Sequence, residues 1–217
     1  MKPGELQAIF FDFDGVILDS TDIKTETFKQ MFEPYGPDVV EQVLKHHLQH
    51  GGISRVEKIR HYHQSFLGKT LSEEELSAYA DSFSNAVKKK VIESPSIAGA
   101  EAFIKKVFKE TDLYIISGTP MDELLEITRE RGYAPYFIEI LGSPTKKPEH
   151  VRRIIRSQQL DPALCLFIGD ALTDYNTALE TGIRFIGIQG EVPFPEGTIV
   201  LPDCTGLEDA IAAMSYS

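Results

Sequence analysis

The fold is decided by Ile9-Phe10-Phe11-Asp12-Phe13-Asp14-Gly15. The apolar half of this stretch, with Ala8 before it, predicts a strand buried on both faces, as in a parallel sheet. Side chains two residues apart on an extended chain point the same way, so Asp12 and Asp14 face one pocket. Ligands bind at this carboxyl end of an open α/β sheet. Two such close charges need a cation or a shared proton, and a solvated aspartate pair in a turn is the alternative.

Length and composition are those of an ordinary globular protein. The chain has 217 residues, 42% apolar and 25% charged, which suits one large domain or a core with a smaller insertion. The net charge of −11 argues against a broad basic surface for nucleic acid. No apolar run reaches the ~18 residues of a membrane helix, and the first strand starts too early for a signal peptide. Cys165 and Cys204 form no metal-spaced pair, so we expect a reduced, cytoplasmic protein.

The order of the predicted elements is that of a doubly wound α/β protein with an insertion. Helical patterns fill residues 20–93, and the capping box Ser72-Glu73-Glu74-Glu75 opens the last of them. Helices and strands then alternate, which favours a parallel sheet. We expect an α/β core domain from residues 1–19 and 94–217, and a small all-α cap domain from residues 20–93. The later strands are predicted at 113–116, 137–141, 164–168, 185–188 and 198–200, and the later helices at 98–109, 121–131, 148–158, 172–181 and from 207.

Polar residues also follow the later strands. Ser117-Gly118-Thr119 ends one of them, where a hydroxyl and backbone N–H groups can hold phosphate oxygens. An ordinary turn is the alternative. Lys146 and Lys147 lie in a later strand–helix loop, from which a lysine either reaches the carboxylates or stays on the surface.

A second acidic pair follows the strand that ends in Phe167-Ile168. If a helix begins near Asp170, Asp170 and Asp174 share one helix face. Acidic residues also favour the first turn of a helix, so a simple helix cap is the alternative.

Together these groups fit phosphoryl transfer. Carboxylates from the ends of two strands make a hard-oxygen site suited to Mg²⁺. One aspartate can attack phosphorus to give an aspartyl-phosphate, and an aspartate two residues on can protonate the leaving alcohol and then deprotonate water. A lysine and Mg²⁺ offset the repulsion between the anions, while the hydroxyl and N–H groups bind the transferring oxygens.

Four motifs in this order resemble the haloacid dehalogenase superfamily, in its phosphoglycolate-phosphatase-like and β-phosphoglucomutase-like branch. They are Asp12-Phe13-Asp14-Gly15-Val16, Ser117-Gly118-Thr119, Lys146-Lys147-Pro148 and Gly169-Asp170 with Asp174. The resemblance covers essentially the whole chain, including a helical cap inserted after the first strand, and four ordered motifs are far more specific than one.

The resemblance implies a role for each motif residue. Asp12 is the nucleophile, and Asp14 is the general acid/base with its backbone carbonyl on the metal. Asp170 is a direct Mg²⁺ ligand, and Asp174 acts behind it or through water. The remaining roles are phosphate binding by Ser117, Gly118 and Thr119, and charge neutralisation by Lys147, with Lys146 as the alternative lysine.

The resemblance also separates possible reactions. Dehalogenases and phosphonatases of the superfamily lack a carboxylate at the position of Asp14, so its presence implies phosphate-ester chemistry. Gly51-Gly52-Ile53-Ser54-Arg55 is similar to a segment of sugar-phosphate mutases whose arginine grips a distal phosphate, although Arg55 and Lys58 could instead form a surface pair. Against a mutase, Lys24 stands where those enzymes carry a histidine. Arg55, Lys58 and Lys24 are our candidates for substrate contact.

We therefore expect a Mg²⁺-dependent phosphatase that hydrolyses a small phosphorylated metabolite under a closing cap. A phosphosugar mutase is the alternative. A non-catalytic binding protein is disfavoured because the motif aspartates and Lys147 are all present. Neither nucleic acid nor a membrane is expected as a partner, and the protein is a monomer or a homodimer. The spacing of the cap histidines fits no metal set; they are His46, His47, His50, His61 and His63.

Overall fold

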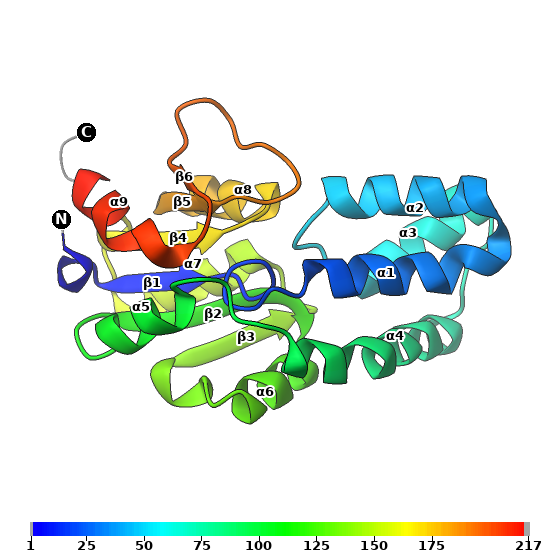
Figure 1. Cartoon of the computed structure of the whole chain (residues 1–217), viewed down its shortest axis with the longest axis horizontal. Coiled ribbons are helices and arrows are strands. Elements are labelled where there is room, and N and C mark those ends of the chain that lie inside the picture. The colour runs from blue at the N-terminus through cyan, green and yellow to red at the C-terminus, as the bar shows by residue number, and fades with distance from the viewer. Residues whose placement is uncertain (1, 215–217) are drawn as a thin grey trace.

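Six parallel strands form one sheet in the order β3-β2-β1-β4-β5-β6 (Figure 1). The computed structural model describes residues 2–214. The first strand of the chain lies in the middle of the sheet, as expected from an apolar run with no polar alternation. The predicted doubly wound α/β fold is confirmed. The strands are β1 (Ala8–Phe11), β2 (Asp112–Pro120), β3 (Glu139–Ser143), β4 (Cys165–Gly169), β5 (Arg184–Ile188) and β6 (Val200–Leu201).

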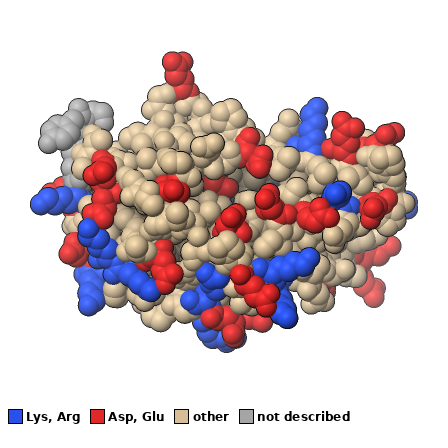
Figure 2. Space-filling model, viewed as in Figure 1, with Lys and Arg blue, Asp and Glu red and all other residues tan. Residues whose placement is uncertain are grey.

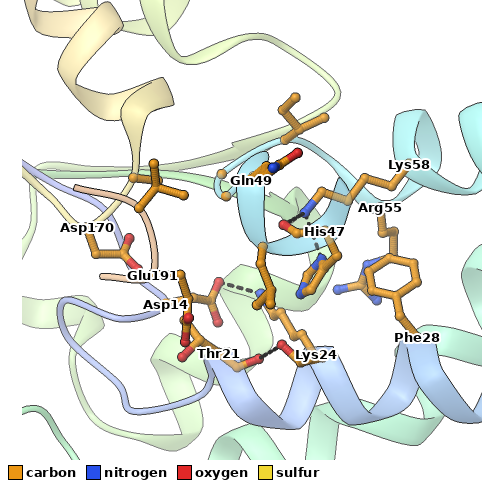
Figure 3. Close-up of a pocket in the computed structure, with 18 of the residues that line it drawn as sticks. Asp14, Thr21, Lys24, Phe28, His47, Gln49, Arg55, Lys58, Asp170 and Glu191 are labelled. Atoms are coloured by element: carbon orange, nitrogen blue, oxygen red, sulfur yellow. Dashed lines mark hydrogen bonds and ion pairs between the residues drawn. The ribbon is translucent and has the colours of Figure 1, made fainter. Parts of the chain in front are cut away.

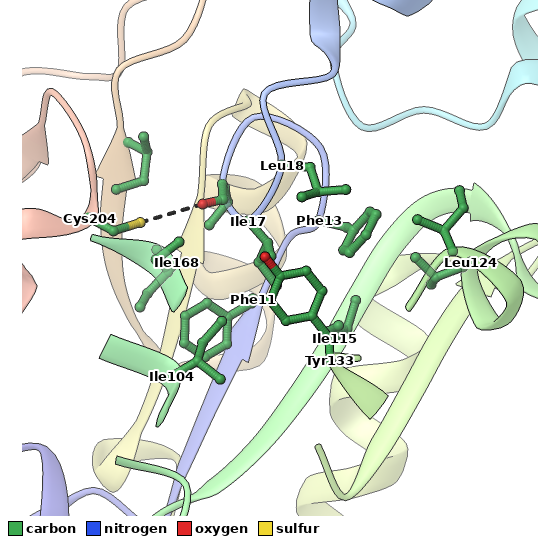
Figure 4. Packing of buried hydrophobic residues seen from close by; sticks show 14 of the residues in the cluster. Phe11, Phe13, Ile17, Leu18, Ile104, Ile115, Leu124, Tyr133, Ile168 and Cys204 are labelled. Atoms are coloured by element: carbon green, nitrogen blue, oxygen red, sulfur yellow. Dashed lines mark hydrogen bonds between the residues drawn. The ribbon is translucent and has the colours of Figure 1, made fainter. Parts of the chain in front are cut away.

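Helices cover both faces of the sheet. Ile9 and Phe11 point to one face, and Ala8 and Phe10 to the other, because side chains alternate along a strand. Figure 4 shows Phe11 among apolar side chains from helices and neighbouring strands. The Phe11 face is covered by α5 (Ala100–Val107), α6 (Met121–Glu130) and α9 (Leu207–Ala213); the Phe10 face is covered by α7 (Lys147–Gln158) and α8 (Leu172–Thr181).

The segment between β1 and β2 forms a helical bundle at one end of the molecule (Figure 1). Its aromatic core centres on Phe28, whose ring lies 5.5 Å from that of Tyr62 and 4.5 Å from that of Phe83. We propose this bundle, hereafter the cap, as the cap domain predicted for residues 20–93. Its helices are α1 (Thr21–Phe32), α2 (Pro37–Gln49), α3 (Arg55–Leu67) and α4 (Glu73–Glu93).

The chain crosses twice between the sheet and the cap, and the two crossings are hydrogen-bonded to each other. The amide of Asp19 donates to the Pro95 carbonyl at 2.9 Å, and the amide of Ile97 donates to the Ile17 carbonyl at 3.0 Å. Arg131, just beyond α6, donates to the carbonyl of Ser94 at 2.5 Å. These bonds fix both crossings beside the carboxyl end of β1.

Some element limits differ from those predicted. β2 continues through residues 117–119, because its pairing with β3 resumes at Pro120 after a register shift, so the Ser117-Gly118-Thr119 segment is not a free turn. β3 begins and ends two residues later than predicted. β6 also starts later than predicted, since the Thr198 amide donates to the Pro195 carbonyl in a turn.

Two surface features bear on partners. Between residues 2 and 214, no helix has both the length and the apolar content to cross a bilayer. On the face shown in Figure 2, basic and acidic side chains are interspersed.

The capping box predicted before α4 is present and gives a test of local stability. The Ser72 hydroxyl accepts a hydrogen bond from the Glu75 amide, and the Glu75 carboxylate accepts one from the Ser72 amide at 2.8 Å. We expect Ser72→Ala to lower the free energy of unfolding by about 1 kcal/mol. Ser77→Ala, on an exposed position of the same helix, should change it by less than about 0.5 kcal/mol. Urea unfolding of both variants checks this, and equal effects would contradict it.

Candidate active site

Asp12 lies directly after the central strand and is buried. Its amide donates to the Ile168 carbonyl at 2.9 Å, which extends the β1–β4 pairing by one bond. One carboxylate oxygen, Oδ1, accepts a hydrogen bond from the Phe13 amide at 2.7 Å. The turn then depends on Gly15, which has φ 79°. A Cβ on Gly15 would lie 2.2 Å from a carboxylate oxygen of Asp170, so only glycine fits there.

Lys147 joins the two acidic motifs. Its Nζ lies 2.8 Å from Oδ2 of Asp12 and 2.6 Å from Oδ1 of Asp174, and all three side chains are buried. Burial lowers the pKa of Lys147, but the two carboxylates outweigh it and raise that pKa above its ordinary value. Lys146 is exposed. The geometry therefore favours Lys147 over Lys146 as the lysine of the site.

Asp170 and Asp174 converge with Asp12, although not as predicted. α8 begins at Leu172, so Asp170 precedes the helix and does not share its face with Asp174. Asp174 instead accepts a hydrogen bond from the Ala171 amide at 3.2 Å and helps to cap the helix. Carboxylate oxygens of Asp12, Asp170 and Asp174 nevertheless lie within 4.8 Å of one another.

This carboxylate group fits a divalent cation. Burial, followed by the charges of Asp12 and Asp174, raises the pKa of Asp170 well above its ordinary value. Burial and the charge of Asp12 raise the pKa of Asp174 to about 7. Lys147 supplies one positive charge to three carboxylates, so the cluster has negative charge left to offset. Hard carboxylate oxygens are the ligands that Mg²⁺ prefers.

Asp14 belongs to a separate network. Its carboxylate accepts hydrogen bonds from the Ser20 hydroxyl at 2.6 Å and the Thr119 hydroxyl at 2.9 Å, and it forms an ion pair with Lys24. Burial raises the pKa of Asp14, but the Lys24 ammonium and these hydrogen bonds outweigh it and hold the pKa below its ordinary value. The Ser20 hydroxyl, at the N-cap position of α1, donates to Asp14 and makes no capping hydrogen bond to the helix.

The Ser117-Gly118-Thr119 segment lies where the cap meets the core. The buried Ser117 hydroxyl accepts a hydrogen bond from the Thr119 amide at 3.1 Å. A Cβ on Gly118 would lie 2.4 Å from the Gly52 carbonyl oxygen of the cap. Beside this contact, the Thr173 hydroxyl donates to the Gly51 carbonyl at 2.8 Å. Two backbone segments therefore touch across the seam, with the cap close to the core.

The cap cations have different partners. Arg55 donates to both carboxylate oxygens of Glu123, at 2.8 and 2.5 Å, and to the Ser84 hydroxyl at 2.6 Å. Arg55 and Lys58 are only 5% and 3% exposed. The alternative of an exposed surface pair is therefore wrong.

Lys58 contacts His47 instead of a carboxylate. Its Nζ lies 2.8 Å from Nδ1 of His47 and 3.2 Å from the His47 carbonyl oxygen. Burial, then the charge of Lys24, lowers the pKa of Lys58 to about 7, and the negative charge of Asp170 opposes this shift. Burial and the charge of Lys58 lower the pKa of His47 to about 3. His47 is thus neutral, and its Nδ1 accepts a hydrogen bond from the Lys58 ammonium group.

Three other cap histidines stack on one another. The ring of His46 lies 3.9 Å from that of His50 and 4.3 Å from that of His61. In the part of the chain that the structure describes, the one group of three or more potential metal ligands is the aspartate cluster.

A cavity of about 110 Å³ lies between the cap and the carboxyl end of the sheet. Figure 3 shows its unlike ends: Asp14, Asp170 and Glu191 gather on one side, and Arg55 and Lys58 lie on the other. Phe28 and Phe83 also line the cavity and lie beside these cations: the Arg55 guanidinium is 4.7 Å from the centre of the Phe83 ring, and Lys58 Nζ is 6.0 Å from that of the Phe28 ring. All three candidate cap residues, Lys24, Arg55 and Lys58, line this cavity, together with Asp12, Gly118 and Thr119.

No motif in the sequence predicts three further partners in this site. Glu123 lies 68 positions from Arg55 in the first turn of α6, where an acidic residue is ordinary. His47 is one of five histidines predicted in the cap, and Ser20 belongs to none of the four motifs. Each joins the site through a contact with a residue distant in the sequence or on another element.

A family model of the haloacid dehalogenase-like hydrolases matches residues 9–188. The chain belongs to this family. Phosphoglycolate phosphatase from Vibrio vulnificus is 25% identical to it over 203 residues, covering 87% of this chain and 86% of that protein. Phosphorylated carbohydrates phosphatase from Thermotoga maritima is 25% identical over 194 residues, covering 83% of this chain and 84% of that protein.

Solved structures share the fold of this haloacid dehalogenase-like hydrolase. One of them, a candidate β-phosphoglucomutase from Bacteroides vulgatus, has a TM-score of 0.76 at 17% identity, covering 97% of this chain and 89% of that one. The superfamily and the enzyme class predicted from the sequence, a hydrolase of the phosphatase type, are confirmed.

The buried Lys58 predicts a stability difference that depends on pH. Its pKa is about 7 in the folded protein against 10.5 ordinarily. Below about pH 7, Lys58 is protonated in both the folded and the unfolded chain, so the burial of its charge lowers the free energy of unfolding by the full amount. Above about pH 7, Lys58 loses its proton in the folded protein alone, and this destabilisation becomes smaller. We expect Lys58→Met to raise the free energy of unfolding by about 3 kcal/mol near pH 6.5. This stabilisation by Lys58→Met should be smaller by roughly 2 kcal/mol at about pH 9.

Urea unfolding at both pH values checks this. Subtracting the free energy of unfolding of the wild type from that of the variant cancels the pH dependence that all other groups contribute. Lys45→Met, at an exposed position of α2, is the control and should show no such difference. A gain for Lys58→Met that does not change with pH would contradict the assignment.

Proposed function

We propose that this protein is a Mg²⁺-dependent phosphatase that hydrolyses a small phosphomonoester through an aspartyl-phosphate on Asp12. The observation that carries the proposal is the position of Asp12. Its carboxylate lines the cavity, is held by Lys147 at 2.8 Å, and lies within 4.8 Å of Asp170 and Asp174. A nucleophile, a counter-charge and a candidate cation site thus meet at one end of the cavity.

In the first step, a carboxylate oxygen of Asp12 forms a bond to phosphorus as the bond from phosphorus to the alcohol oxygen breaks. Asp14 gives its proton to that oxygen. The Lys24 ion pair holds Asp14 as an anion in this structure, and an arriving phosphate dianion raises its affinity for the proton. The Ser117 hydroxyl and the Gly118 and Thr119 amides are assigned to the phosphoryl oxygens.

In the second step, Asp14 accepts a proton from a water molecule that attacks the phosphorus. The bond between phosphorus and the Asp12 oxygen breaks, which releases inorganic phosphate and restores the Asp12 carboxylate and the protonated Asp14. Mg²⁺ would be held by Asp12, Asp170 and the Asp14 backbone carbonyl, with Asp174 behind them, and would supply positive charge to the transferring oxygens. Lys147 supplies further positive charge at Asp12 and fixes its orientation.

The cap supports a phosphatase over the mutase alternative. A mutase of this branch would need a free arginine for the second phosphate of a bisphosphate. Arg55 is committed to both oxygens of Glu123. Lys24, at the position of the mutase histidine, pairs with Asp14. The two reactions are separated by giving a sugar phosphate with its bisphosphate: phosphate release supports the phosphatase, and isomerisation without release supports the mutase.

The proposal includes a reduced, cytoplasmic setting and a monomer or homodimer. Cys165 and Cys204 support the first part, since both thiols are free and buried. The small cavity supports a small metabolite in place of a phosphoprotein.

Asp12→Asn should abolish turnover while the fold persists, because the amide oxygen is a poor nucleophile. We expect kcat to fall by about 10⁴-fold or more, measured as phosphate release from p-nitrophenyl phosphate with Mg²⁺. Circular dichroism and the melting temperature report the fold, and Asp112→Asn, at an exposed residue of β2, is the control. Activity near that of the wild type would refute Asp12 as the nucleophile.

Removal of Mg²⁺ should also abolish turnover. EDTA should abolish phosphate release, and added Mg²⁺ should restore it. We expect Asp170→Asn to weaken Mg²⁺ binding by about 10- to 100-fold, measured directly by titration calorimetry as well as from the activity. Undiminished activity in EDTA, or unchanged Mg²⁺ affinity in the variant, would speak against this site.

A further inference from the structure

A second cavity, of about 270 Å³, adjoins the one that Asp12 lines. Of the described residues, Asp12 lines the first cavity alone, whereas Lys147, whose Nζ lies 2.8 Å from the Asp12 carboxylate, lines the second alone. Gly52, Ile53 and Gly118 line both cavities. The boundary between the two cavities therefore runs along this ion pair and these three residues.

The second cavity is polar and opens to the surface. Thr145, Lys146 and Asn176 of its lining are exposed, so they form an outer rim. The hydroxyl groups that line it belong to Ser54, Ser117, Ser143, Thr145, Thr173 and Thr177. A water molecule needs roughly 15 Å³ of such space, so the cavity has room for a hydrated phosphate ion and hydroxyl groups to solvate it.

The boundary between the cavities includes a glycine with no room for a side chain. A Cβ on Gly52 would lie 2.1 Å from the Thr173 hydroxyl oxygen and 3.1 Å from Nζ of Lys147. Thr173 and Lys147 both line the second cavity. Because Gly52 has no side chain, space remains beside the Lys147 ammonium group at the inner end of this cavity.

The proposed reaction places its two products against different cavities. The alcohol oxygen receives its proton from Asp14, which lines the first cavity and not the second. Of the groups assigned to the phosphoryl oxygens, the Ser117 hydroxyl lines the second cavity, as does Lys147 beside Asp12. The alcohol thus departs into the first cavity, while the phosphate that remains on the enzyme faces the second.

The charges of the second cavity do not oppose the passage of an anion. Its carboxylates are those of Glu57 and Glu180, which are both exposed. Arg152 pairs with Glu180 at 2.9 Å, and the exposed Lys146 on the rim is opposite in charge to Glu57. An anion that passes Lys147 therefore meets hydroxyl groups and then a rim of mixed, solvent-screened charges.

We propose that the second cavity is a transient site for inorganic phosphate, which leaves through it past Ser117 and Lys147, whereas the alcohol leaves through the first cavity. The inference rests on the proposed function and adds a separate route for one of its products. The Arg55–Glu123 ion pair, which joins the cap to the core, need not break when phosphate leaves in this way.

Large side chains at the rim of the second cavity test the proposal. Asn176→Trp on α8 and Thr145→Trp in the loop before α7 each place an indole ring at an exposed rim position. With p-nitrophenyl phosphate and Mg²⁺, we expect either variant to lower kcat by about 10-fold, because phosphate release then limits turnover. KM should fall by the same factor, since kcat/KM includes only the steps up to the departure of p-nitrophenol. A rapid first turnover of p-nitrophenol should precede the slow steady state.

Two control variants separate a blocked route from an altered surface. Asn176→Ala changes the same rim position without adding bulk. Leu179→Trp adds the same ring at an exposed position of α8 that is outside the lining of both cavities. We expect both controls to keep the kcat and KM of the wild type. Circular dichroism and the melting temperature report whether each variant folds.

An isotope measurement reports directly how long phosphate stays bound. While phosphate remains in the site, Asp12 can attack it again and expel water, which re-forms the aspartyl-phosphate, and the next hydrolysis adds another oxygen from the solvent. For reactions in H₂¹⁸O, mass spectrometry counts the labelled oxygens in the released phosphate. We expect the fraction with two or more labelled oxygens to rise several-fold in Asn176→Trp and Thr145→Trp, and not in the controls.

The outcomes separate this inference from the proposed function. A joint fall of kcat and KM with added isotope exchange, in the blocked variants alone, supports the second cavity as the phosphate route. Unchanged kinetics and exchange in both folded blocked variants, or a fall in kcat/KM without added exchange, would overturn that route and leave the phosphatase standing. No Mg²⁺-dependent hydrolysis of p-nitrophenyl phosphate by the wild type would overturn the phosphatase and the inference with it.

Discussion

The site depends on the ammonium group of Lys147, which lies between Asp12 and Asp174. Three carboxylates brought within 4.8 Å in a buried place repel one another. One lysine, buried at the start of α7, contacts two of them at 2.8 and 2.6 Å. Without it, the strand ends could not approach as the sheet requires, because leaving two buried carboxylates without their partner costs several kcal/mol. The same cluster keeps enough negative charge to attract a cation.

A second constraint holds the cap over these carboxylates. Backbone segments of the cap and the core approach closely at Gly52 and Gly118, where no side chain would fit. The Arg55–Glu123 pair then joins α3 of the cap to α6 of the core through two short hydrogen bonds. Two parallel hydrogen bonds between a guanidinium and a carboxylate restrict the relative orientation of the two side chains, and so of α3 and α6. With the cap in this position, the charge of Arg55 is balanced by Glu123, although the sequence alone would assign Arg55 to the substrate.

The core of the site could be predicted from the sequence for a geometric reason. In a parallel sheet, all carboxyl ends meet at one edge, so polar residues toward the carboxyl ends of β1, β2 and β4 had to converge once the strands were recognised. Asp12, Ser117 and Asp170 follow this rule. This convergence does not depend on a helix face shared by Asp170 and Asp174: Asp170 lies before α8, yet its carboxylate lies within 4.8 Å of that of Asp12.

The cap did not allow the same reasoning. Contacts between helices depend on how each helix is rotated and where it crosses its neighbour, and no motif fixes either. Lys24, Arg55 and Lys58 look alike in the sequence as candidates for an anionic substrate. In the fold, Asp14 balances the first and Glu123 balances the second, while the third contacts a neutral histidine. A pocket attracts a charged ligand through the side chains whose charge no other residue balances. Which side chains these are depends on the ion pairs that form in the folded protein, and the sequence alone does not specify those pairs.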